Sequence, residues 1–284
     1  MRGALIRVPG STANLGPGFD VLAAALDLFL TVEVEETGEF RLLTDMHIRR
    51  DRDNLIVRAF ERLMPADGVE FRVSSTIPLS GGMGSSAAGV VAGLLAAEYL
   101  AGRGAAEVLT LATEIEGHPD NVAASLLGGL DVCDGPDVRR IEMPPELEAV
   151  LVIPNRPVRT AAAREALPEA VPMADAVHNL AQIAKLTAGL ATSDWELIAG
   201  GLGDRLHQPY RAHLYPRSAE IVARAADHGA LGATISGAGP TVLIWCRPGE
   251  RPAALMQWLD TIAAEWAEVR VVRFEPDGAS VTPL

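Results

Sequence analysis

The stretch that decides the fold reads Pro78-Leu79-Ser80-Gly81-Gly82-Met83-Gly84-Ser85-Ser86-Ala87-Ala88. It follows residues 69–77, which alternate as in a half-buried strand, and it opens residues 85–100, which are apolar on nearly every side, as in a buried central helix. Its glycines permit a loop whose amides point inward, and the helix start adds free N–H groups and the positive end of the dipole. The unit therefore predicts a phosphate site, although it lacks the Gly-Lys-Ser/Thr ending of a Walker A loop. A purely structural turn is the alternative.

The elements on both sides of this unit are mixed. Upstream, an apolar strand starts at residues 4–8, residues 28–35 alternate as a second strand, and Asp53-Asn54 can cap a helix. The remaining predicted elements are helices at 105–116, 174–191, 219–228 and 251–266, and strands at 149–153, 232–236, 241–246 and 268–274. Because this order is not a regular βαβα alternation, it favours an α+β fold over a doubly wound sheet. The proline-rich residues 143–145 suggest a boundary between domains 1–147 and 148–284.

The composition is typical of a globular protein, and its net negative charge disfavours binding to polyanions. Hydrophobic residues make up 49% of the 284, which excludes disorder as the main theme. The 24 Lys+Arg against 37 Asp+Glu give a net charge of −13. So acidic a surface repels phosphate backbones and anionic lipid heads, so we expect no nucleic-acid partner and no membrane partner. The start of the chain is too poor in apolar residues for a signal peptide, and residues 87–97 are too few to cross a bilayer. We therefore expect a cytoplasmic protein, with Cys133 and Cys246 as free buried thiols.

Two further glycine-rich segments lie toward the two ends of the sequence. Residues 9–20 place Asn14 and Asp20 among small and apolar neighbours, where a buried amide or carboxylate needs a partner such as a polar substrate. A surface turn is the alternative. Residues 236–241 lie between two apolar strands and predict by themselves only a hairpin turn.

Residues 114–121 gather polar side chains at the end of a predicted helix. The segment reads Glu114-Ile115-Glu116-Gly117-His118-Pro119-Asp120-Asn121. Its carboxylate oxygens suit magnesium, and it has no His/Cys set suited to zinc. A solvated helix end followed by a turn is the alternative.

Together these segments resemble the GHMP kinases, and most closely the members that act on L-homoserine. Residues 78–88 look like the family's phosphate loop, Pro-x-x-x-Gly-Leu-Gly-Ser-Ser-Ala, with Met83 for the usual Leu. Ser80-Gly81 stands where Ala-Arg is frequent, so any contact from that arginine is absent. Residues 236–241 look like the C-terminal glycine motif that supports the loop. The more specific matches are residues 11–20 and 116–123, and the matching stretches run from near residue 8 to near residue 245.

The resemblance implies a two-domain α+β architecture with an active-site cleft between the domains. It implies ATP, Mg²⁺ and L-homoserine, with transfer of the γ-phosphoryl group to the side-chain hydroxyl as a step of threonine biosynthesis, and it leaves a homodimer open. The residues it implies for substrate binding are Asn14, Asp20, His118, Asn121, Arg164 and Arg211. Those it implies for ATP are Asn54, Gly237, Gly239 and all of residues 78–88. Those it implies for the metal are Ser85, Ser86 and Glu114, with Glu116 as the alternative register, and the catalytic set is Asn121, Ser86 and Glu114.

The residue types agree with this reading. A guanidinium suits a carboxylate and Asp20 suits an ammonium, although Arg164 could instead pair with Glu165 or Glu169 on a helix surface. Because the position beside the acceptor hydroxyl resembles Asn121, which cannot take a proton, we expect catalysis without a dedicated protein base. The rival readings are a GHMP kinase for another small acid, such as shikimate or mevalonate, and a non-catalytic ligand sensor on the same fold.

Overall fold

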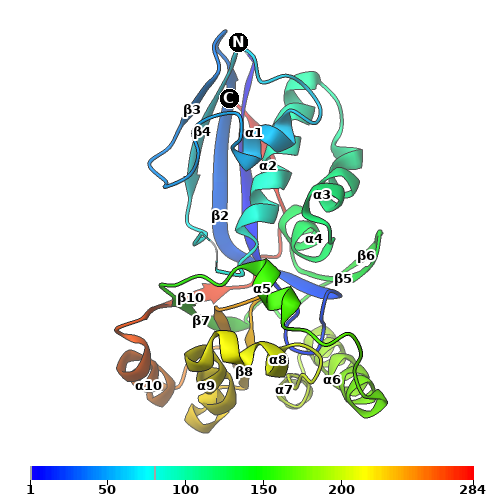
Figure 1. Cartoon of the computed structure of the whole chain (residues 1–284), viewed down its shortest axis with the longest axis vertical. Helices are drawn as coiled ribbons and strands as arrows, with labels where there is room; N and C mark the ends of the chain where they lie inside the picture. The colour runs from blue at the N-terminus through cyan, green and yellow to red at the C-terminus, as the bar shows by residue number, and fades with distance from the viewer. Residues whose placement is uncertain (1, 80) are drawn as a thin grey trace.

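The protein is built on two sheets that lie one beyond the other along its longest axis. The computed structural model describes residues 2–79 and 81–284, and Figure 1 shows the larger sheet above and the smaller one below. Helices cover both sheets without a regular strand-helix alternation. The expected α+β class is confirmed.

The larger sheet has the strand order β11-β1-β2-β4-β3, and β5 and β6 continue it from β2. Its strands are β1 (Gly3–Ala13), β2 (Leu22–Glu36), β3 (Arg41–Leu43), β4 (Val69–Ser75), β5 (Leu130–Asp134), β6 (Asp137–Ile141) and β11 (Ser280–Pro283). Only the β3–β4 pairing is parallel among the described strands. The alternation predicted for residues 28–35 is confirmed, because Leu28, Leu30, Val32 and Val34 are all buried.

One face of the larger sheet carries a layer of helices (Figure 1). They are α1 (Leu55–Phe60), α2 (Ser85–Ala101), the 3₁₀ turn η1 (Ala105–Glu107), α3 (Val108–Glu116) and α4 (Asp120–Leu127). Helix α2 is the buried central helix that the sequence predicts. It approaches α1 so closely that a Cβ on Gly93 would lie 2.2 Å from the carbonyl oxygen of Ile56. This packing fixes the start of α2, and with it the glycine-rich loop that precedes it.

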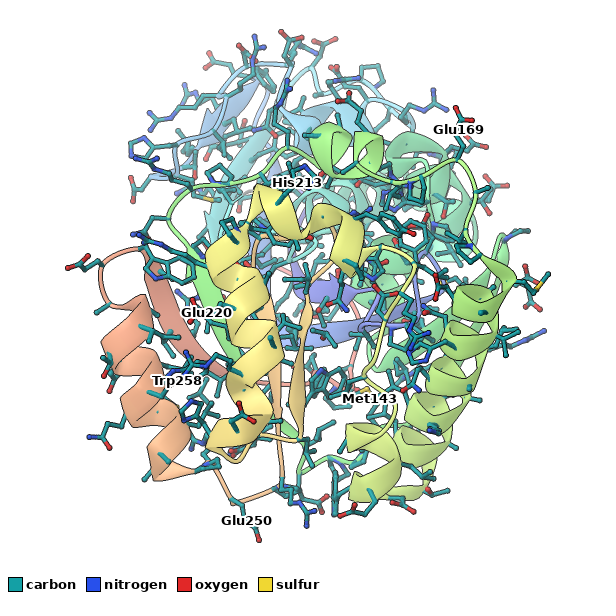
Figure 2. The ribbon with its side chains drawn as sticks, turned by 60° about the horizontal axis from the view of Figure 1, so that its bottom comes forward. Met143, Glu169, His213, Glu220, Glu250 and Trp258 are labelled. Carbon is teal, nitrogen blue, oxygen red and sulfur yellow. The ribbon has the colours of Figure 1, made fainter. Side chains whose placement is uncertain are left out.

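The smaller sheet has the order β10-β7-β9-β8. Its strands are β7 (Glu148–Pro154), β8 (Gly232–Ile235), β9 (Val242–Cys246) and β10 (Ala267–Arg273). The helices of this part are α5 (Thr160–Glu165), α6 (Met173–Thr192), α7 (Trp195–Ala199), α8 (Gln208–Arg211), α9 (Pro216–Arg224) and α10 (Ala253–Ala263), with 3₁₀ turns η2 (Ala212–Leu214) and η3 (Ala225–His228). Figure 2 shows α9, which carries Glu220, beside α10, which carries Trp258.

Some elements differ from the sequence prediction. Strand β1 continues to Ala13, inside the stretch that reads as a loop, while α4 and the β5–β6 hairpin were not predicted. Strand β11 returns to the larger sheet and pairs with β1. The domain boundary between residues 147 and 148 therefore stays a prediction. Strand β11 follows that boundary in the sequence but belongs to the same sheet as β1.

The remaining sequence expectations concern the thiols and the membrane. Cys133 and Cys246 are free and buried, as predicted. Burial raises the pKa of Cys133 to about 12 and that of Cys246 to about 11, so both remain protonated thiols. Among the described residues, no helix combines the length and the apolar character needed to span a bilayer.

Candidate active site

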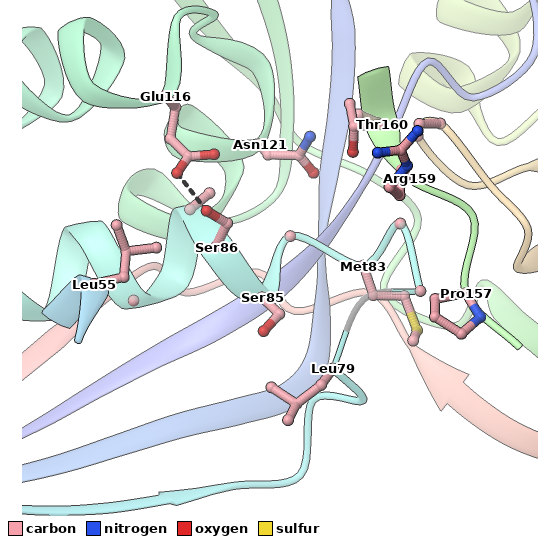
Figure 3. A pocket seen from close by; sticks show the side chains of 18 of the residues that line it. Leu55, Leu79, Met83, Ser85, Ser86, Glu116, Asn121, Pro157, Arg159 and Thr160 are labelled. Atoms are coloured by element: carbon pink, nitrogen blue, oxygen red, sulfur yellow. Dashed lines mark hydrogen bonds between the residues drawn. The ribbon is translucent and has the colours of Figure 1, made fainter. Parts of the chain in front are cut away.

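A cleft of about 1060 Å³ runs between the helical layer of the larger sheet and the α5 segment. All three glycine-rich segments of the sequence contribute to its lining, together with residues 46–56 and 115–121. Figure 3 looks into this cleft from close by. Segments that are far apart in the sequence thus meet at one place.

The phosphate-type loop is held by contacts that only glycine permits. Gly82 and Gly84 have φ of 78° and 63°, and Gly84 is the N-cap of α2. A Cβ on Gly82 would lie 2.3 Å from the carbonyl oxygen of Ser236, and one on Gly84 would lie 2.0 Å from Oγ of Ser11. The Ser236 hydroxyl donates to the carbonyl oxygen of Gly82 at 2.6 Å. The third glycine-rich segment therefore braces the first.

The first turn of α2 faces the cleft. Ser85, Ser86 and Ala87 line it at the helix start, where backbone N–H groups have no helical partner. The other loop residues that line the cleft are Leu79, Gly81, Gly82, Met83 and Gly84. Pro78 and Ala88 do not line it, and Ala88 is fully buried in the core. Ser80 lies outside the described residues.

The two glutamates near the end of α3 point in different directions. The Ser86 hydroxyl donates to Oε1 of Glu116 at 2.5 Å, and both residues line the cleft (Figure 3). The Glu114 carboxylate lies instead 3.5 Å from Nη2 of Arg62, outside the cleft lining. Residues two positions apart on an α-helix point about 200° apart around its axis, which explains why Glu114 and Glu116 face different sides. The expectation that Glu114 joins Ser85 and Ser86 is therefore not met, and Glu116, the alternative register, stands in that place.

Asn121 lies at the start of α4 in a fixed orientation. Oδ1 of the buried Asp120 accepts from the Asn121 amide at 2.7 Å and from Nδ1 of His118 at 2.8 Å. The Ser11 hydroxyl donates to Oδ1 of Asn121 at 2.9 Å. The hydrogen bond that His118 donates to Asp120 is the main reason that the pKa of His118 is raised. Asp120 thus orients its neighbours, and His118 and Asn121 face the cleft.

Asp20 and Arg164 face each other at one end of the cleft. Nη1 and Nη2 of Arg164 donate to the two carboxylate oxygens of Asp20 at 3.1 and 3.2 Å, a bidentate pair that leaves both side chains partly exposed. Within the described residues, Arg164 is therefore paired with Asp20 and not with Glu165, the last residue of α5, or with Glu169 beyond it. The two ions bring one negative and one positive group to the same end of the cleft.

Asn14 holds the Asp20 loop in a backbone conformation that side chains rarely adopt. Asn14 and Asp20 have φ of 71° and 54°. Nδ2 of the Asn14 side chain donates to the carbonyl oxygen of Gly237 at 2.7 Å. Oδ1 of the same side chain accepts from the backbone N–H of Asp20 at 3.0 Å. Asn14 lines the cleft, but its side-chain atoms already bridge two loops. Its geometry is that of a residue that positions Asp20.

Arg211 is a buried arginine, 2% exposed, at the same end of the cleft as Arg164. Nε of Arg211 donates to the carbonyl oxygen of Ala163 at 2.8 Å, and Nη1 lies 3.2 Å from Nδ1 of His207. Nε2 of His207 lies 2.8 Å from the carbonyl oxygen of Gly16, so the ring proton is on Nε2 and Nδ1 accepts from Arg211. Burial lowers the pKa of His207, which keeps the ring neutral. The remaining N–H groups of the Arg211 guanidinium have no hydrogen-bond partner within the described ranges 2–79 and 81–284, so a ligand can use them.

Asn54 lines the opposite end of the cleft, but its side chain is committed to the backbone. It caps α1 by accepting from the Ile56 amide at 2.9 Å, and its Nδ2 donates to the carbonyl oxygen of Arg49 at 2.7 Å. Both contacts fix the 46–56 segment as a wall of the cleft. Asn54 therefore shapes this end, where the wall combines apolar side chains such as Met46 and Ile48 with the charged pair of Arg49 and Asp53.

Sequence reasoning missed several residues of this site. Ser11 and His207 act through tertiary contacts, and Arg159 lines the cleft although nothing in its local sequence sets it apart. The one local signal was the position of His207, four residues before Arg211, which places both on one side of a helical turn. Glu116 could have been chosen over Glu114 only by knowing the rotation of α3 about its axis.

Comparisons with known proteins agree on one family. The models for the GHMP kinases N terminal domain and the GHMP kinases C terminal domain match residues 54–129 and 184–261. The chain is 41% identical to a homoserine kinase of Moorella thermoacetica over 263 residues, 87% of this chain and 88% of that protein. It is 43% identical to a homoserine kinase of Synechococcus sp. strain CC9605 over 269 residues, 88% and 85% of the two chains.

Solved structures extend the same similarity to the fold. The crystal structure of homoserine kinase from Cytophaga hutchinsonii matches with a TM-score of 0.86 and 28% identity, covering 99% of this chain and 97% of that one. A mevalonate kinase crystal structure matches with a TM-score of 0.72 and 18% identity, covering 96% and 99%. At that identity the second likeness shows the fold alone.

Proposed function

The chain belongs to the GHMP kinase family, and on this premise we propose that it transfers the γ-phosphoryl group of ATP to the side-chain hydroxyl of L-homoserine, giving O-phospho-L-homoserine. The single observation that carries the substrate is the meeting of Asp20, Arg164 and Arg211 at one end of a cleft whose other part is a glycine-rich phosphate loop. Homoserine brings an ammonium, a carboxylate and a hydroxyl. The similarity to homoserine kinases over most of the chain supports the same substrate.

The two charged groups of homoserine would bind the two partners of the Asp20–Arg164 ion pair separately. The ammonium would bind Asp20, and the carboxylate would bind the guanidinium forks of Arg164 and Arg211. In a protein of net charge −13, such a local pair of cations is needed because the global field opposes a carboxylate. Mevalonate and shikimate carry the carboxylate but no ammonium, so they would leave Asp20 without a partner.

The phosphate end would be held mainly by backbone. The amides of the loop and of the first turn of α2 would bind the ATP phosphates. Ser86 and Glu116 offer hard oxygen ligands 2.5 Å apart, which fit a magnesium ion that keeps several waters and binds substrate phosphates. When bound, magnesium would neutralise phosphate charge. We propose Ser86 and Glu116, with Ser85 beside them, as its protein contacts.

Catalysis would rest on position and charge. Asn121 and His118 lie between the phosphate loop and the Asp20–Arg164 end, where the acceptor hydroxyl would come to rest. Asn121 can orient that hydroxyl but cannot take its proton. A phosphoryl-transfer transition state with little bond formation to the attacking oxygen does not need early proton removal. The contacts of Asp120 to His118 and to the Asn121 amide are those of a positioning group.

We expect Asp120→Asn to keep kcat within about tenfold of wild type, below the loss expected when a general base is removed. The variant keeps an oxygen for the Asn121 amide but removes the charge beside His118. Because Asp120 is what raises the His118 pKa, an NMR titration of the imidazole should show that pKa moving down. A loss of kcat by several orders of magnitude in the folded variant would make Asp120 the base and contradict this mechanism.

The substrate assignment is tested by a panel of hydroxy acids and amino acids that differ from L-homoserine in the ammonium group, the carbon skeleton or the chain length. ADP release should be followed with magnesium-ATP and L-homoserine, 4-hydroxybutyrate, mevalonate, shikimate or L-serine. We expect L-homoserine to be preferred, and 4-hydroxybutyrate, which lacks only the ammonium, to lose roughly 30-fold or more in kcat/KM because Asp20 is left unpaired. Preference for mevalonate or shikimate would assign another kinase of the family. Binding without turnover of any compound would assign the non-catalytic sensor.

A further inference from the structure

The phosphate loop carries no cation of its own. Residues 78–88 contain no lysine, arginine or histidine, so the loop offers a triphosphate only amides and hydroxyls. At the start of α2, the Ser86 hydroxyl donates to an acidic side chain, that of Glu116. A triphosphate gathers further negative charge on its terminal group as transfer proceeds, and a guanidinium is the side chain best shaped to meet it.

Four arginines line the cleft, and three of them have partners. Arg49 lies 3.2 Å from Asp51 and 2.7 Å from Asp53. Arg164 pairs with Asp20, and Arg211 is held by Ala163 and His207. The guanidinium of Arg159 has no ion pair and no hydrogen bond to any residue within 2–79 or 81–284. Among the four cleft-lining arginines, Arg159 is the one whose whole guanidinium has no partner in the described part of the chain.

Arg159 stands across the cleft from the phosphate loop. It directly precedes α5, and residues 157–160 form the wall that faces the loop. Figure 3 shows Arg159 and Thr160 on that wall, on the side of the loop turn that carries Met83, with Pro157 beside them. Arg164 lies more than one helical turn further along α5 and is directed at Asp20. The two arginines of this segment therefore address different ends of the cleft.

We propose that Arg159 binds the terminal phosphoryl group of ATP and neutralises the charge that develops there during transfer. The inference rests on the proposed kinase function, because it needs ATP in the loop. It assigns separate roles on one short segment: Arg159 to the transferred group and Arg164 to the substrate carboxylate. No base and no covalent intermediate is involved, and the contact is one of charge and hydrogen bonding.

The test compares nucleotides that differ only in the terminal phosphate. Arg159→Ala, Arg159→Lys and the control Arg156→Ala are titrated by calorimetry with magnesium and either ADP or a non-hydrolysable ATP analogue. Arg156 is exposed in the same segment and does not line the cleft. We expect Arg159→Ala to bind the analogue about tenfold more weakly while ADP affinity stays within about twofold, with Arg159→Lys between it and wild type. In turnover assays kcat should fall about 10²-fold, less than for a dedicated arginine finger, because Arg159 is exposed.

Three results would overturn the assignment. If the variant binds ADP and the ATP analogue with equally reduced affinity, Arg159 contacts the inner phosphates and not the terminal one. Unchanged nucleotide binding together with a raised homoserine KM would make it a third carboxylate arginine. Unchanged binding and unchanged kcat would make it a surface residue. The nucleotide titrations need no homoserine, so they still read out Arg159 if the proposed substrate proves wrong.

Discussion

Glu116→Gln is expected to lower kcat about 10²–10³-fold, the range found when one electrostatic contact to a transition state is removed. The Glu116 carboxylate accepts the Ser86 hydroxyl at 2.5 Å at the start of α2, and both side chains line the cleft. Glutamine keeps the length of the side chain and can still accept from Ser86, but it carries no charge for a magnesium ion. The measurement is kcat at saturating ATP and homoserine over a series of magnesium concentrations.

The neighbouring carboxylate provides the matched control. Glu114 lies on the same helix two residues earlier, exposed and paired with Arg62, so Glu114→Gln should leave kcat within about threefold, since exposed ion pairs contribute little. Excess magnesium should partly restore Glu116→Gln and leave Glu114→Gln unchanged. The reverse pattern, with Glu114→Gln the damaged variant, would return the metal contact to the residue that the family resemblance first suggested.

Arg211→Ala and Arg164→Ala should raise the KM for homoserine far more than the KM for ATP. Truncating one partner of a charge pair with a bound carboxylate costs about 2–5 kcal/mol, or roughly 30- to 5000-fold in binding. Arg211 should lie at the upper end, because it is buried and its loss also leaves Nδ1 of His207 without a donor. Arg164 should lie at the lower end, because it is partly exposed.

Two further variants separate binding from folding in this experiment. Arg211→Lys keeps a charge in the cavity but not the fork, so it should fold better than Arg211→Ala and still bind homoserine weakly. Arg205→Ala removes an exposed arginine that pairs with Asp175 outside the cleft, and its homoserine KM should stay near wild type. A wild-type homoserine KM in both Arg164→Ala and Arg211→Ala would show that the carboxylate binds elsewhere.

The sequence predicted the parts of this site that depend on local structure. The loop at 78–88 could be predicted because glycines at φ above 60° and a helix start leave a signature in a few adjacent residues. The central helix and the alternating strand β2 could be predicted because their burial follows a simple period. These elements fixed the class of fold before any contact was known.

What the sequence could not predict depends on rotation and on distant partners. Glu114 and Glu116 differ only in the face of α3 on which they lie, which the packing of the whole helical layer decides. His207 is 191 residues from Gly16, the carbonyl that sets its tautomer. Arg159 is distinguished only by what lies across the cleft. Each of these features depends on the three-dimensional arrangement of distant segments, so no local sequence pattern indicates it.

The return of β11 to the larger sheet has a consequence for how the protein is made. The edge of β1 that β11 covers belongs to the first sheet to leave the ribosome, yet its partner residues are 280–283. The larger sheet can therefore form with one edge of β1 open, and that edge is paired only after residues 280–283 have been synthesised. Until residues 280–283 have been made, that edge of β1 lacks its partner strand, and an unpaired edge is a template for pairing with another chain.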